Sequence, residues 1–213
     1  MLSRWPGLFP PGFSVVYALV FCAGVYFSPA MAWWLPLGVL VVTDAALNFH
    51  YQARGIDVWH WSVIKYQLVN YLGYVVIIWL GRGLKPKAKG STPPGGVARG
   101  LIRFFTLLGG GVLGALIFYL VTNTASWLLN PFNNHEYTRS VSGWLIAIIK
   151  GTNGWPPTWE FFRNTLLSSG LFTGLFVAAM ELGAVESPAD KTAGVRAEAP
   201  ETEVEPGAEK AEA

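Results

Sequence analysis

Charged residues are scarce in this chain. They make up 13% of its 213 residues, against about 25% in a typical soluble domain, whereas hydrophobic residues make up 52%. A soluble fold of this length could not bury so much apolar surface, so the expected solvent is the lipid bilayer. The single cysteine, Cys22, excludes an internal disulfide and is expected to be a small buried apolar side chain.

Sequence motifs for catalysis are also missing. No GK[ST] is present, which argues against a phosphate-binding loop, and the three histidines lack a metal-ligand spacing such as HExxH. An intramembrane enzyme would have to use isolated groups such as His50, His60 or His135. We therefore predict that the chain is not an enzyme, that it binds no cofactor or metal, and that it has no nucleic-acid partner.

Charge is unevenly distributed along the chain. Residues 1–185 hold twelve Lys/Arg and five Asp/Glu, whereas residues 186–213 hold three Lys/Arg and eight Asp/Glu. The acidic segment has no aromatic residue, so it cannot bury enough apolar area to offset the entropy lost on ordering. Two regions are predicted: a transmembrane helical domain over 1–185 and a disordered acidic tail over 186–213.

Five apolar stretches approach the length needed to cross about 30 Å of hydrocarbon. A sixth, Val141–Ile149, is too short to span and is predicted to be an interfacial or re-entrant helix. The expected fold is all-α, a polytopic membrane helical bundle. Its five spans are Phe13–Phe27 (short), Ala30–Asn48, Ser62–Leu80, Ile102–Val121 and Trp159–Leu182.

Basic residues set the predicted orientation. The segment from Arg82 to Arg103 carries six Lys/Arg and no acid, which favours the cytoplasmic side. Counting outward from it places the N-terminus outside and the C-terminus in the cytoplasm. The loop from Asn123 to Trp159 then faces outward.

Polar residues collect at the predicted outer ends of three spans. Asp44 lies inside an apolar run with Asn48 four residues on, and ionisable groups within spans often mark functional sites. The structural alternative is that Asp44 caps a helix or pairs with a basic residue. Tyr119, Thr122, Asn123 and Ser126 follow helical spacing and form one stripe.

A second polar face lies at the start of the last span. The simplest explanation of this face is an ion pair between Glu160 and Arg163, which are three residues apart. The functional alternative is an outward cavity for a small, largely uncharged or weakly charged solute, with the loop from Ser126 to Trp159 as a lid. The candidate solute-binding residues are Asp44, Asn48, Asn123, Ser126, Trp127, Trp159, Glu160, Arg163 and Asn164.

Four segments carry a resemblance to a known group. "LSRWPGLFPPGFSVVYALVFCAGVYF", "LPLGVLVVTDAALNFH", "NTASWL" and "GWPPTWEFFRNTLLSSGLFTGLF" resemble an uncharacterised family of small bacterial membrane proteins. That family is similar to the substrate-binding S components of energy-coupling-factor (ECF) vitamin transporters. The resemblance implies a bacterial inner (plasma) membrane location. It also implies six spans, the first lying before the "LSR" stretch, so this chain looks as if it lacks the first transmembrane helix.

Two functions follow as expectations. The first is the solute-binding component of a small-molecule transporter, whose energy comes from a coupling subunit and an ATPase. The second is a structural or assembly subunit, whose polar patches bind another membrane protein. Membrane lipid is the common partner of both, and the sequence does not name the solute.

Overall fold

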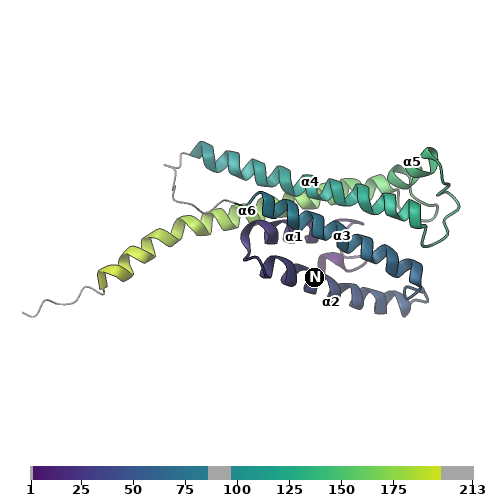
Figure 1. The fold of residues 1–213 in the computed structure, drawn as a ribbon, viewed down its shortest axis with the longest axis horizontal. Helices are drawn as coiled ribbons and strands as arrows, with labels where there is room; N and C mark the ends of the chain where they lie inside the picture. Colours follow the sequence, from purple (N-terminus) through teal and green to yellow (C-terminus); the bar gives the residue numbers. More distant parts are fainter. Residues whose placement is uncertain (1, 86–96, 198–213) are drawn as a thin grey trace, which may run out of the picture. The chain divides into compact units, whose positions relative to one another are not determined.

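The computed structural model describes the backbone of residues 2–85 and 97–197 and the side chains of 3–85 and 100–181. Every regular element in these residues is a helix, as predicted (Figure 1). A 3₁₀ turn, η1 (Leu2–Arg4), precedes six helices. They are α1 (Val16–Tyr26), α2 (Met31–Gln52), α3 (Trp61–Gly83), α4 (Val97–Leu129), α5 (Val141–Ile149) and α6 (Thr158–Ala197).

Two compact units divide the chain, Met1–Ala178 and Ala179–Ala213. The first contains α1 to α5 and the first half of α6. In the second, the backbone is helical as far as Ala197, although the composition predicts disorder from residue 186. The rest of the predicted tail, 198–213, and the middle of the predicted basic loop, 86–96, lie outside the described residues.

Three helices of the described chain are long and apolar enough to cross a membrane: Met31–Gln52, Trp61–Gly83 and Gly100–Leu129. They correspond to the second, third and fourth predicted spans. The first predicted span is shorter than expected, because α1 has only 11 residues and reaches about 16 Å at 1.5 Å per residue. The count of five spans therefore stays a prediction, whereas the predicted short helix Val141–Ile149 coincides with α5.

The described part of α6 buries its polar side and exposes its apolar side. Ser168, Ser169 and Thr173 are each 0% exposed. On the opposite side, Leu167 is 60% and Leu171 is 52% exposed. This inverted pattern suits a helix that faces lipid, since water would favour the reverse.

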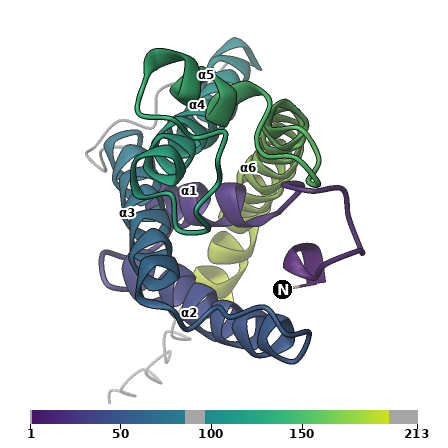
Figure 2. The same ribbon diagram turned by 90° about the vertical axis from the view of Figure 1, so that its right-hand side faces the viewer.

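Helix α1 lies at the centre of the first unit, with α2, α3, α4 and α6 around it (Figure 2). Its contact with α3 depends on two glycines. A Cβ placed on Gly24 would meet the backbone oxygen of Ile78, and one on Gly81 would meet the backbone oxygen of Phe21. Small residues at such a crossing let two backbones approach closely, which is a common basis of helix association in membranes.

The predicted small-residue pairs have different environments. A Cβ on Gly110 or Gly114 would contact side chains of α1 or α3, whereas Gly170 and Gly174 have only ordinary van der Waals neighbours. The tight contact between α4 and α6 lies instead at Gly111, where a Cβ would meet the Thr173 side chain. Ser169 Oγ donates to the Gly111 carbonyl there at 2.9 Å.

Residues 5–15, between η1 and α1, are non-helical, and this segment lies between α2 and α6 (Figure 2). Its carbonyls need donors, because irregular backbone within a membrane bundle must be satisfied by protein or water. Asn164 Nδ2 donates to the Pro11 carbonyl at 2.9 Å, and Thr165 Oγ1 donates to the Gly12 carbonyl at 3.3 Å. The polar start of α6 thus anchors this segment.

Candidate functional site

A cavity of about 730 Å³ lies within the first unit, lined by the N-terminal segment, α1 to α4, the loops around α5 and the start of α6. Pockets for small molecules range over about 300–1,000 Å³ and combine mostly apolar walls with a few placed polar groups. Aromatic rings form much of this wall. They belong to Tyr17, Tyr51, Tyr66, Tyr74, Phe118, Tyr119, Phe132, Tyr137, Trp155 and Phe161.

Asp44 lines the cavity and is held on both oxygens. Arg4 Nη2 lies 2.5 Å from its Oδ1, and the Tyr71 hydroxyl donates to its Oδ2 at 2.7 Å. Arg4 Nη1 also donates to Thr43 Oγ1 at 2.6 Å. Each member of the ion pair is less than one-fifth exposed, so the structural alternative, a pair with a basic residue, is present inside the cavity wall.

Asn48 forms a reciprocal amide pair with Gln67 of α3. Gln67 Nε2 donates to Asn48 Oδ1 at 2.8 Å, and Asn48 Nδ2 donates back at 3.4 Å. Both residues line the cavity. The pair ties α2 to α3 at this level and presents neutral amides to the cavity.

The predicted stripe on α4 faces the cavity as a whole, since Tyr119, Thr122, Asn123 and Ser126 all line it. Asn123 Nδ2 donates to the Tyr119 carbonyl at 2.8 Å, as an in-helix bond four residues back. This contact fixes the amide and leaves its oxygen without a hydrogen bond in the described part of the chain. The stripe is the part of the site that helical spacing predicts most completely.

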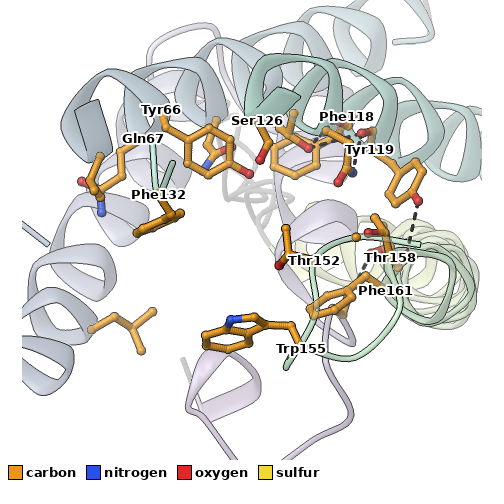
Figure 3. A pocket seen from close by; sticks show the side chains of 18 of the residues that line it. Tyr66, Gln67, Phe118, Tyr119, Ser126, Phe132, Thr152, Trp155, Thr158 and Phe161 are labelled. Atoms are coloured by element: carbon orange, nitrogen blue, oxygen red, sulfur yellow. Dashed lines mark hydrogen bonds between the residues drawn. The ribbon is translucent and has the colours of Figure 1, made fainter. Parts of the chain in front are cut away.

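The loop between α4 and α6 covers the cavity on one side. Thr152 and Trp155 point into it across from Tyr66 and Ser126 (Figure 3). The lid is tied to the bundle, because the Tyr119 hydroxyl donates to the Ile148 and Thr158 carbonyls. The other lid residues that line the cavity are Phe132, Asn134, Tyr137, Gly151, Pro156 and Thr158.

Two ionisable side chains of the lid have pKa values that differ from their ordinary values. Backbone N–H groups, its own and that of Asn153, hydrogen-bond the Glu136 carboxylate and hold its pKa below the usual range. Partial burial raises the pKa of the Tyr137 hydroxyl, against a lowering contribution from its hydrogen bond to Ser126. The Tyr137 hydroxyl is therefore neutral at neutral pH. The Glu136 carboxylate is ionised there but does not line the cavity, so the lid brings no charge of its own to the cavity.

Several neutral polar groups that line the cavity have no hydrogen-bond partner within the described part of the chain. They line the open cavity, where a bound solute or water can supply the missing partner. The Asn123 carbonyl oxygen is one, since only its amide nitrogen is bonded. The others are the side-chain polar groups of Tyr66, Asn70, Tyr74, Asn134 and Thr152.

Four of the nine predicted site residues, Asp44, Asn48, Asn123 and Ser126, line one cavity. The other five do not. Trp127 Nε1 donates to the Thr138 carbonyl at 2.7 Å, Trp159 stacks with the Arg163 guanidinium 5.2 Å from its ring centre, and Asn164 binds the Pro11 carbonyl.

The expected Glu160–Arg163 pair does not form in the described structure, where Arg4–Asp44 is the salt bridge. Arg163 instead contacts Trp159 and donates to Asn164 Oδ1 at 3.4 Å. Stacking on an indole lets the guanidinium stay solvated, which a close ion pair would reduce. Among the described residues, no group of three or more His, Cys, Asp or Glu side chains could hold a metal ion.

The model of DUF6580, a family of unknown function, matches residues 1–190. The chain belongs to the DUF6580 family. No curated protein and no solved structure matches it, so the resemblance of this DUF6580 protein to S components stays a prediction.

The sequence pattern did not identify all the residues that line the cavity of this DUF6580 protein. Tyr66, Asn70 and Tyr74 recur every four residues in α3, a spacing that places them on one face and that could have been found. Arg4 offered no such signal, since its contact with Asp44 joins residues 40 positions apart across an irregular segment.

Proposed function

We propose that this DUF6580 protein is a membrane protein that binds a small, largely uncharged or weakly charged solute in the cavity, as the solute-binding component of a transporter. The observation that carries the proposal is the set of cavity-lining polar groups without a protein partner. These groups come from α3, α4 and the lid, so a solute that binds all of them bridges the three.

The charge of the lining supports a solute that is uncharged or weakly charged. Arg4 and Asp44 are the charged side chains among the lining residues, and they offset one another. An ion that broke this pair would leave one buried charge uncompensated, which is costly. The remaining polar groups are amides and hydroxyls, which bind neutral donors and acceptors equally well.

The position of the lid supports capture of the solute from outside the cell. With the N-terminus outside and the C-terminus in the cytoplasm, the loop from Ser126 to Trp159 faces outward and covers the entrance. The resemblance and the apolar helices support a bacterial inner-membrane location. Transport needs an energy source in another protein, as in a coupling subunit with an ATPase.

Removing one solute-binding amide tests the proposal. Wild-type protein purified in mild detergent is expected to release one dominant small molecule, measured by liquid chromatography and mass spectrometry. Asn123→Ala and Asn70→Ala should each retain about five- to tenfold less of it, since a net hydrogen bond contributes about 1 kcal/mol. Asn153→Ala is the matched control, because Asn153 is exposed and does not line the cavity.

The outcome that contradicts the proposal is a wild-type protein that releases no small molecule. If such a protein also co-purifies with one membrane protein in fixed ratio, the chain is a structural or assembly subunit. Equal retention by wild type and both cavity variants would show that the released molecule binds elsewhere.

A further inference from the structure

A smaller cavity of about 180 Å³ lies at the start of α1. It shares Arg4, Gly12, Tyr17 and Tyr74 with the large cavity, so the two adjoin at these residues. Its size suits one functional group of a solute whose body occupies the larger space. The remaining lining residues are Ser3, Pro10, Phe13 and Ser14.

Backbone donors gather at this junction. The first hydrogen bond of α1 runs from Leu19 N–H to the Val15 carbonyl, so the N–H groups of the first turn are not used by the helix. Ser3 and Ser14 accept from the N–H groups of Val15 and Val16, both at 3.3 Å. A helix start carries a partial positive charge that favours anions.

Two side chains add unused donors. The Tyr74 hydroxyl has no hydrogen-bond partner in the described part of the chain, although the residue is only 6% exposed and lines both cavities. Tyr74 is fixed by stacking on Phe118, with ring centres 4.6 Å apart. Arg4 has five N–H donors, and its described contacts to Asp44 and Thr43 use two of its nitrogens.

The nearby acceptors are already occupied. Asp44 binds Arg4 through one oxygen and Tyr71 through the other. Both oxygens of Asp44 are thus bonded, whereas the Tyr74 hydroxyl and part of the Arg4 guanidinium are unused, and the charge of the junction is that of a neutral ion pair beside a helix start. This balance favours one negative charge and disfavours two.

We propose that this junction is a carboxylate subsite, so that the solute of the large cavity is a small organic monocarboxylate. Its carboxylate would receive hydrogen bonds from the Tyr74 hydroxyl and from the free side of the Arg4 guanidinium, at the start of α1. Arg4 then lies between two carboxylates, that of Asp44 and that of the solute. The inference rests on the proposed function, because it assigns one end of the same solute.

Two matched probes test the subsite, para-fluorobenzoate and its neutral isostere para-fluorobenzamide. Binding of each to full-length protein in lipid nanodiscs, freed of co-purified solute, is followed by fluorine NMR at neutral pH. We expect the acid to bind about tenfold more tightly than the amide, since charge-assisted hydrogen bonds are about twice as strong as neutral ones. Tyr74→Phe should reduce this preference to about threefold or less.

Tyr26→Phe is the control, because it makes the same chemical change at a residue that lines neither cavity. It should leave the ratio of the two affinities unchanged. Equal binding of acid and amide by wild type would overturn the carboxylate subsite and leave the solute cavity intact. A preference that survives Tyr74→Phe, or a wild type that binds neither probe, would overturn it as well, while the small-molecule release assay decides the proposed function separately.

Discussion

Asp44→Ala is expected to lower the free energy of unfolding by about 3 kcal/mol, because it leaves the Arg4 guanidinium buried without its counter-charge. The contact is close, at 2.5 Å, and the two side chains are 18% and 17% exposed. The substitution also removes the acceptor of the Tyr71 hydroxyl. In a thermal unfolding scan of the purified protein, the loss corresponds to a fall in Tm of about 10 °C.

Two further variants separate the ion pair from general damage. Asp57→Ala removes an exposed carboxylate that accepts only from the nearby Trp59 N–H, and it should change Tm by about 2 °C or less. The double variant Arg4→Met/Asp44→Leu removes both charges and should recover most of the loss. An Asp44→Ala protein as stable as wild type would show that Arg4 does not depend on this carboxylate.

Gly81→Ala is expected to have the second-largest effect, a destabilisation of about 2–3 kcal/mol. An added Cβ would overlap the Phe21 backbone oxygen, and a backbone atom cannot move aside as a side chain can. Helix α1 would have to separate from α3 at its closest point. The measurement is again Tm, together with the fraction of protein that stays monodisperse in detergent.

Gly38→Ala provides the matched control, since it is also inside a helix but a Cβ there has no neighbour within 4 Å. Alanine is about 1 kcal/mol better than glycine in a helix, so this variant should equal or exceed wild type. If Gly81→Ala behaved like Gly38→Ala, the close crossing of α1 and α3 would not contribute to the stability of the bundle.

Helical periodicity predicted the fold class and the centre of the site. Apolar runs located α2, α3 and α4, and the short run at Val141–Ile149 matched α5. The spacing of Tyr119, Thr122, Asn123 and Ser126 placed all four on the cavity wall. These features succeed because neighbours three or four residues apart share a helix face whatever the tertiary structure.

Long-range contacts account for the differences between the expected and the observed positions. Asn164 resembled a ligand-binding amide in its helical pattern, but it binds the Pro11 carbonyl, 153 residues away in sequence. The first predicted span is a helix of 11 residues, since the segment around Pro10 and Pro11 is irregular and its carbonyls are satisfied by α6. The local sequence pattern does not indicate which distant side chains donate hydrogen bonds to the carbonyls of an irregular segment.

Native mass spectrometry of the protein extracted with its own lipids tests the central claim, that the large cavity holds one small solute. The account predicts a wild-type species heavier than the 23.3 kDa chain by one small molecule. The extra mass should be absent in Ser126→Trp, which fills the cavity, and present in Ser142→Trp, where the serine is exposed on α5 and outside the lining. A wild type found only at the mass of the bare chain, or an extra mass that persists in Ser126→Trp, would contradict it.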